Sequence, residues 1–184
     1  MNASRVITLL LVVSVAVVQL ASQQTKADQK PIEDVKAKAE AGDAKSQVEL
    51  GRRYDKGEGV MKDHVEAAKW YLKAAEQNYA EAQNSLGVCY LNSEGVAKRE
   101  VEAVKWFRKA AEQNYVDAQF NLGMCYEEAD PGTEDWAEVY KWLSLAARQG
   151  HEGAKKFMTV LESKLMTPEQ IAQGQKRARE FKPR

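Results

Sequence analysis

The sequence predicts an all-α fold, an α/α superhelix (solenoid) built from stacked helix-turn-helix units. Three observations predict this fold. The chain matches itself at an offset of 36 residues, the step from Leu50 to Leu86, and each unit shows helical apolar spacing twice. Glycine or proline separates the two halves of each unit. A single pair of helices cannot bury such an apolar surface, so units of this kind stack on their neighbours.

Four positions recur in all three units: a leucine, the glycine after it, a tyrosine three residues further on, and a tryptophan in the second half. These residues are Leu50, Gly51, Tyr54 and Trp70, then Leu86, Gly87, Tyr90 and Trp106, and finally Leu122, Gly123, Tyr126 and Trp142. A glycine inside a helix costs about 1 kcal/mol relative to alanine, so its presence calls for compensation. We expect each of these glycines to receive the tryptophan of the neighbouring helix against its bare backbone.

The first 27 residues have the layout of a secretory signal peptide. Arg5 precedes an uncharged apolar run, residues 6–18, which is shorter than the roughly 20 residues of a transmembrane helix. Small residues at Thr25 and Ala27 favour cleavage after Ala27 over cleavage after Ala21. An uncleaved membrane anchor and a packed core helix are the other two interpretations. We therefore expect an exported protein, periplasmic or extracellular, that contacts a membrane only if the leader is uncleaved.

The rest of the chain divides along the repeat. Pro31 and Gly42 mark the start and stop of an amphipathic helix that would cap the first unit. In the last segment Thr159 and Glu162 replace the recurring glycine and tyrosine, so a fourth unit there is degenerate. The predicted segments are an N-terminal capping helix within 28–43, repeats at 44–79, 80–115 and 116–151, and the degenerate fourth repeat with a C-terminal capping helix at 152–184.

The C-terminal capping helix has its own start signal. Thr167 would be the N-cap, Pro168 the first helical residue and Gln170 the third, which is a capping-box arrangement. We expect this helix to run to about Phe181 and to close the stack. The basic residues of 176–184 complement the helix dipole, and attraction to acidic lipid or protein is the alternative role for them.

Composition argues against several classes of function. The chain has 27 Lys and Arg against 27 Asp and Glu, so no overall field attracts nucleic acid. Its two histidines, His64 and His151, lie far apart and without a cysteine or carboxylate cluster at ligand spacing. The sequence also lacks the usual nucleophile, zinc-protease and phosphate-binding motifs. We expect no catalysis, no cofactor and no metal.

Two cysteines and one tryptophan remain as candidates for chemistry or binding. Cys89 and Cys125 occupy the same position in adjacent units, where helices lie about 8–10 Å apart. A disulfide needs Cα atoms closer than about 7 Å, which favours two free, largely buried thiols; an inter-unit disulfide and a partner-linked thiol are the alternatives. Trp136 stands outside the repeat register beside Pro131 and Gly132, so we expect partial exposure and name it as the one aromatic candidate for anchoring a partner.

With these residues the sequence resembles the Sel-1-like repeat family, a relative of the tetratricopeptide repeats. Tetratricopeptide units carry tryptophan in the first helix, where Gln47, Gln83 and Gln119 stand here, and the tryptophans of this chain fall in the second helix. The resemblance covers residues 36–165 and implies a scaffold or adaptor that binds a protein or peptide through the curved surface of the stack. The alternative is a cell-envelope hydrolase with its site in that groove, suggested only by export and by scattered acidic residues.

Overall fold

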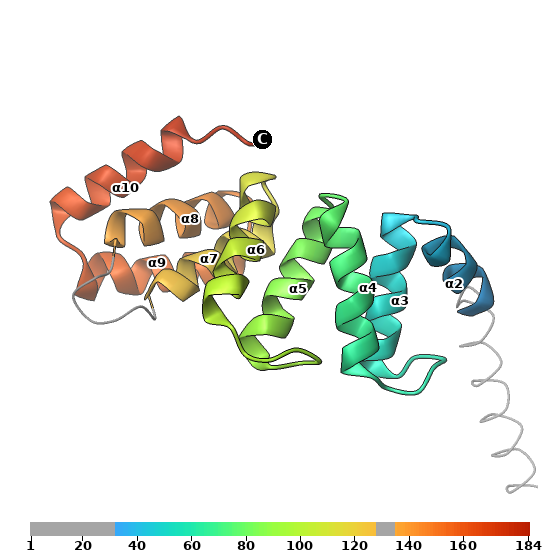
Figure 1. Cartoon of the computed structure of the whole chain (residues 1–184). Coiled ribbons are helices and arrows are strands. Elements are labelled where there is room, and N and C mark those ends of the chain that lie inside the picture. Colours follow the sequence, from blue (N-terminus) through green and yellow to red (C-terminus); the bar gives the residue numbers. More distant parts are fainter. Residues whose placement is uncertain (1–31, 128–134) are drawn as a thin grey trace, which may run out of the picture.

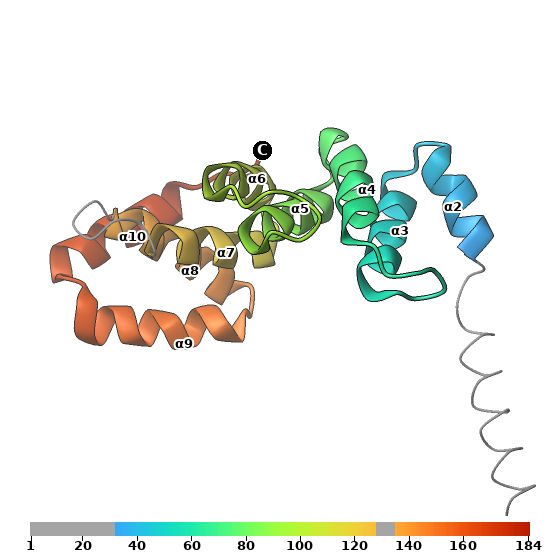
Figure 2. The ribbon, with the colours of Figure 1, turned by 60° about the horizontal axis from the view of Figure 1, so that its bottom comes forward.

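The structure is a computed structural model that describes residues 32–127 and 135–184, and these residues form helices and no strands. The helices follow one another in chain order and build an elongated stack (Figures 1 and 2). This arrangement confirms the all-α solenoid predicted from the repeat. The signal peptide predicted over 1–27 and the connector containing Pro131 and Gly132 lie outside the described residues.

Three helical hairpins make up the body of the stack. Each hairpin has a first helix and a second helix that pack together, and the second helix packs on the first helix of the next hairpin. The hairpins are α3 (Ala44–Lys56) with α4 (His64–Glu76), α5 (Ala80–Asn92) with α6 (Glu100–Glu112), and α7 (Val116–Glu127) with α8 (Trp136–Arg148). They are preceded by α2 (Ile32–Glu40) and followed by α9 (Glu152–Val160), the π-helical turn η1 (Leu161–Leu165) and α10 (Pro168–Glu180).

The chain ends its helices with side-chain caps and left-handed residues. The carboxylate of Asp43 accepts a hydrogen bond of 2.8 Å from the backbone N–H of Ser46 at the start of α3. Gly57 ends α3 at a φ of 76°, and Ser93 ends α5 in the same left-handed conformation at 62°. The second loop therefore keeps the geometry of the first although serine has replaced glycine.

A large side chain does pack against each recurring glycine, but it is not the tryptophan that the sequence predicted. A Cβ added to Gly51 would lie 2.7 Å from Cε1 of Tyr71, and one added to Gly87 would lie 2.6 Å from Cε1 of Phe107. In the third hairpin Leu143 occupies this place, 2.8 Å from a Cβ on Gly123. The residue that follows each tryptophan packs on the glycine, because one step along a helix turns a side chain by about 100°.

The tryptophans instead join one unit to the preceding one. Trp70 belongs to a cluster with Val35 and Ala39 of α2, and Trp106 packs against the cluster of the first hairpin. Trp142 is 1% exposed and packs in the cluster of the second hairpin, whereas Trp106 is only half-buried. Trp106 therefore neither packs on a recurring glycine, as the sequence suggested, nor is fully buried.

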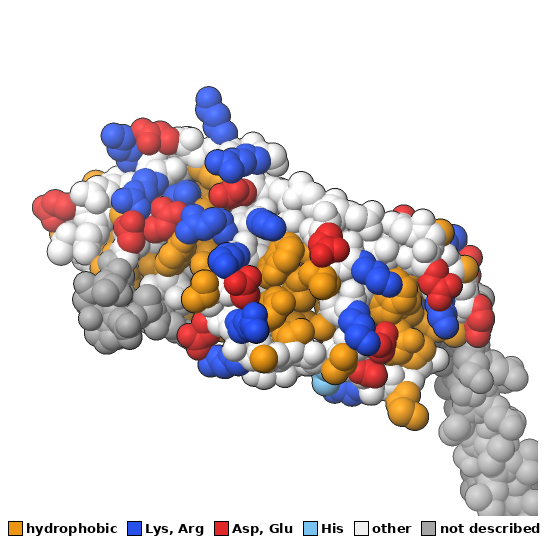
Figure 3. All heavy atoms as spheres, in the orientation of Figure 1, with side chains coloured by type: hydrophobic (Ala, Val, Ile, Leu, Met, Phe, Trp, Pro, Cys, Tyr) orange, Lys and Arg blue, Asp and Glu red, His pale blue; other side chains and the backbone are white. Residues whose placement is uncertain are grey.

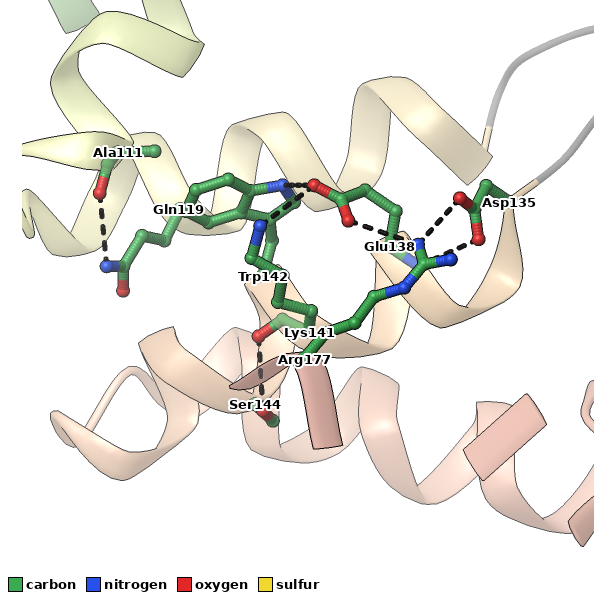
Figure 4. A network of polar contacts seen from close by, with 8 residues as sticks. All are labelled: Ala111, Gln119, Asp135, Glu138, Lys141, Trp142, Ser144 and Arg177. Atoms are coloured by element: carbon green, nitrogen blue, oxygen red, sulfur yellow. Dashed lines mark hydrogen bonds and ion pairs between the residues drawn. The ribbon is translucent and has the colours of Figure 1, made fainter. Parts of the chain in front are cut away.

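A ladder of buried amides crosses the stack at the glutamines that replace the tetratricopeptide tryptophan. Each glutamine donates from Nε2 to the carbonyl of an alanine eight residues earlier, at 3.0 to 3.4 Å. Each also accepts a hydrogen bond from a glutamine thirty residues later, at 2.8 to 2.9 Å. Figure 4 shows one rung, from Gln119 to Ala111. Because both ends of each amide are bonded, these polar side chains are accommodated inside the core.

The C-terminal capping box is present, but the helix that it starts does not pair with α9. Thr167 and Gln170 form both reciprocal hydrogen bonds of the box. Helix α10 then packs against α8, as Figure 1 shows. Gly174 permits this approach, since a Cβ there would lie 2.6 Å from Cβ of Tyr140. The last helix thus closes the stack by covering the second helix of the third hairpin.

Candidate partner-binding groove

A groove of about 940 Å³ opens at the N-terminal end of the stack, beside α2, α3 and the start of α5. Charged side chains of both signs dominate its walls. The lining residues are Asp34, Asp43, Glu49, Glu58 and Glu81, Lys38, Lys45, Arg52 and Arg53, together with Val35, Ser46 and Val48. A wall of this composition suits a polar or charged segment of a partner.

Two arginines and two glutamates build the fixed part of the wall on α3 and the loop after it. Arg52 donates from Nη2 to Glu49 Oε2 at 2.6 Å and from Nη1 to Glu58 Oε2 at 3.4 Å. Arg53 donates from Nε to the other oxygen of Glu49 at 2.8 Å, although Arg53 itself is only 5% exposed. The spacing of three and four residues places Glu49, Arg52 and Arg53 on one face of α3, and Glu58 reaches Arg52 from the loop that follows.

The environment keeps Glu49 charged. Burial opposes the charge, but the hydrogen bonds from Arg52 and Arg53 outweigh it and hold the pKa of Glu49 below its usual range. The hydrogen bonds that Arg52 donates to Glu49 in turn raise the pKa of Arg52. Asp43, at the rim, has a lowered pKa because Ser46 donates hydrogen bonds to its carboxylate. The groove therefore presents fixed ionic charges at neutral pH.

The sequence analysis did not identify Glu49, Arg52 and Arg53 as site residues, although a comparison of the repeats shows that the first unit differs there. Arg53 stands where the later units have Cys89 and Cys125, so the first unit is charged at a position that is apolar elsewhere. Cys89 is buried and Cys125 half-buried, and both lie on first helices. Among the described residues no first helix precedes α3, so Arg53 faces the groove where Cys89 faces a neighbouring unit.

The groove side of the first helices changes character along the stack. At 36-residue steps Arg52 is followed by Val88, Met124 and Val160. Val88 lines a smaller hollow of about 130 Å³ with Ser85, which corresponds to Glu49. The surface is thus charged in the first unit and increasingly aliphatic in the units that follow.

Trp136, the aromatic candidate of the sequence analysis, lies elsewhere. It is the first residue of α8, half-buried, and it packs against the cluster that contains Val139 and Leu143. It is not among the residues that line the groove. The structure therefore does not bring the predicted anchor and the groove together.

A second polar network holds the C-terminal cap in place and is shown in Figure 4. Arg177 of α10 donates to Asp135 Oδ2 at 2.7 Å and to Glu138 Oε2 at 3.2 Å. Glu138 also accepts hydrogen bonds from Nζ of Lys141 at 3.0 Å and from Nε1 of Trp142 at 2.8 Å. Burial opposes the charge of Asp135, but the hydrogen bond from Arg177 prevails and lowers its pKa. The network ties α10 to α8.

Residues 32–127 and 135–184 include one deeply buried thiol, that of Cys89. Burial raises the pKa of the Cys89 thiol to about 12, which keeps it protonated and unreactive. No group of three or more His, Cys, Asp or Glu in these ranges could hold a metal ion. No helix in the same ranges is long and apolar enough to span a bilayer.

The hairpin register coincides with a known repeat. The Sel1 repeat model matches residues 44–79, 80–115 and 116–151. The chain belongs to the Sel1 repeat family. Solved structures of other Sel1 repeat proteins resemble it. The crystal structure of a Sel1 repeat protein from Oxalobacter formigenes has 39% sequence identity and a TM-score of 0.63, and the match covers 67% of this chain and 51% of that one.

Two further Sel1-type relatives come from Escherichia coli. A protective antigen of uropathogenic strains that displays an SLR fold is 38% identical, with a TM-score of 0.70 over 80% of this chain and 33% of that chain. The secretory immunoglobulin A-binding protein EsiB of Escherichia coli O6:H1 (strain CFT073) is 46% identical over 43 residues, which are 23% of this chain and 9% of EsiB. This Sel1 repeat protein thus spans about half the length, or less, of these relatives.

Proposed function

We propose that this Sel1 repeat protein is an exported scaffold that binds a protein or peptide partner in the groove beside α2 and α3. The charged wall built by Glu49, Arg52 and Arg53 is the observation that carries the proposal. A chain segment with charges of its own would find both signs there, held in place by hydrogen bonds. Specificity would come from charge complementarity, and the aliphatic surface of the later units would add contact area.

The relatives support a binding role. EsiB is named for binding secretory immunoglobulin A, so at least one protein with such repeats has a protein partner. The match to EsiB covers 43 residues, and it therefore supports a kind of partner rather than a particular one.

The groove favours binding over hydrolysis. A hydrolase that uses acidic side chains, the alternative raised above, needs a carboxylic acid whose pKa is raised so that it can donate a proton near neutral pH. In this groove the carboxyl groups of Asp43 and Glu49 shift in the opposite direction, to lower pKa. Both also have structural partners, since Asp43 caps α3 and Glu49 pairs with two arginines.

Export is the part of the proposal that rests on the N-terminal sequence. The apolar run of residues 6–18 would direct the chain across a membrane, to the periplasm or the cell exterior. The leader would then be cleaved, with Ala27 as the preferred site, or retained as an anchor. The N-terminal sequence and mass of the protein recovered from the cell envelope distinguish the two forms.

The binding proposal is tested by reversing one charge of the groove. Lys45 lines the groove and is exposed, so Lys45→Glu changes the wall with little effect on folding. The wild type and the variant are used to capture proteins from an envelope fraction, and each captured protein is then titrated against both. The proposal predicts that a partner bound by the wild type is bound severalfold more weakly by Lys45→Glu.

Lys176→Glu is the matched control, because Lys176 is an exposed lysine on α10 away from the groove. It makes the same change in net charge and should leave binding unaltered. Equal loss of binding in both variants would mean that overall charge, and not the groove, attracts the partner. A folded wild type that captures nothing would contradict the proposal as a whole.

A further inference from the structure

Exposed apolar side chains gather at one edge of the stack. Met61 is 89% exposed, Val65 50% and Val101 69%. They belong to the loop between α3 and α4 and to the first turns of α4 and α6. Exposed apolar side chains that share one surface are typical of sites that contact a less polar partner.

The loops bring these residues onto one continuous edge. A Cβ added to Gly95 would lie 2.0 Å from the carbonyl oxygen of His64 and 2.7 Å from the backbone nitrogen of Val65. The loop of the second hairpin therefore rests directly on the start of α4, between Val65 and Val101. Figure 3 shows hydrophobic side chains spaced along this lower edge of the molecule.

At the start of its second helix, the third hairpin does not continue the apolar edge. The third hairpin has Ala137 at the position of Val65 and Val101, and Ala137 is only 3% exposed on the helix that α10 covers. Met61, Val65 and Val101 thus belong to the two hairpins nearest the N-terminus.

The N-terminal segment joins the stack at this same edge. Val35 and Ala39 of α2 lie 36 residues before Tyr71 and Ala75 of α4, so α2 stands in the place of a second helix. It runs in the same direction as α4, as Figure 1 shows, and its first residue, Ile32, corresponds to Ala68, one turn inside α4. The residues before Ile32 include the apolar run of 6–18. The chain that contains this apolar run therefore continues into the stack at Ile32, the first residue of α2.

We infer that this edge rests on a lipid bilayer in the chain that retains its leader, with Met61, Val65 and Val101 in the interfacial layer. The leader would hold the stack near the membrane, and the three side chains would add a second contact that is favoured because the first is already made. Lys62 and Arg99 flank them, are exposed and can extend toward lipid headgroups, whereas Lys56 and Lys98 pair with Glu58 and Glu100. The inference rests on the retained form of the leader and is independent of what the groove binds.

The test places an environment-sensitive fluorophore at position 61 of the full chain. Met61→Cys is labelled in a Cys89→Ala/Cys125→Ser background, and the chain is reconstituted with vesicles of phosphatidylcholine and phosphatidylglycerol. Glu76→Cys, at the other end of α4, is the matched control, because a helix of 13 residues separates its ends by about 18 Å. Flotation confirms that both labelled chains are bound to the vesicles, and circular dichroism confirms that both are folded.

We expect the label at 61 to shift its emission to the blue and to be quenched severalfold more strongly by nitroxide lipids than the label at 76. If the label at position 61 of the vesicle-bound chain emits as it does in water and is not quenched by nitroxide lipids, the inference is overturned. Shielding of position 61 that needs added envelope proteins and is absent with lipid alone would also overturn it, in favour of a protein contact. Should Met61→Cys fail to fold, Val101→Cys gives the same comparison at the neighbouring loop.

Discussion

At the scale of single residues, each hairpin depends on a contact between a bare glycine backbone and one large side chain. Gly51 meets Tyr71, Gly87 meets Phe107 and Gly123 meets Leu143. The cost of glycine in a helix, about 1 kcal/mol, is offset by the closer approach of two helices. The identity of the inserted side chain varies, so the repeat preserves the space and not the ring.

Gly87→Ala tests this contact directly. The new Cβ would lie 2.6 Å from the ring of Phe107, so the ring or the helix must move. Overpacking of this kind costs about 1–3 kcal/mol, which exceeds the gain from helix propensity. Urea unfolding should show a net loss of stability, and Phe107→Leu in the same chain should recover part of it because leucine fills this place in the third hairpin. A more stable Gly87→Ala variant would contradict the packing.

The tryptophans offer a second comparison within one molecule. Trp142 is 1% exposed, whereas its equivalent Trp106 is half-buried. Trp142→Ala should therefore cost about 3–5 kcal/mol in the free energy of unfolding, the usual range for a buried aromatic. Trp106→Ala should lower the free energy of unfolding by clearly less than this. Equal losses for the two variants in denaturant unfolding would mean that exposure does not distinguish the two rings.

At the scale of elements, the sequence predicts which segments are helical better than it predicts which helices meet. The 36-residue offset, the glycines between half-units and the capping box at Thr167 locate the hairpins and the start of α10. These signals are local or periodic. The packing of α10 on α8 depends on Gly174 and Arg177, which lie outside the repeat register. The groove was missed for a similar reason, since its wall comes from the residues in which the first unit departs from the others.

The contact between α10 and α8 should weaken in acid. Because Arg177 lowers the pKa of Asp135, the pair stabilises the docked helix above the ordinary aspartate pKa of about 3.9, and this stabilisation is lost as the pH falls through the lower, folded value. Hydrogen exchange of the α10 amides, measured as the pH is lowered through this range, should show a rising opening constant. In Arg177→Gln the opening constant of the α10 amides should be larger at neutral pH and should depend less on pH. An unchanged pH dependence in Arg177→Gln would exclude this ion pair as its source.

At the scale of the whole molecule, the stack is nearly one-dimensional. Every packed pair of helices consists of neighbours along the chain, apart from α10, which returns to α8. The groove and the apolar edge both lie at the N-terminal end, and the cap lies at the other. In such an array, stability is close to a sum over units and their interfaces. One end can therefore change while the other keeps its structure.

Removal of residues 167–184 tests this separation. The truncation takes away α10 and exposes the face of Tyr140 on which Gly174 packs, so α8 loses a neighbour. Native-state hydrogen exchange should show lower protection in α8 and unchanged protection in α3, since within the part of the chain described the extensive packing of α10 is against α8 and not against the first hairpin. An equal fall in protection at both ends would show that the stack opens as one cooperative unit. In that case the groove and the cap would be coupled in stability, and substitutions at Arg177 would weaken binding in the groove.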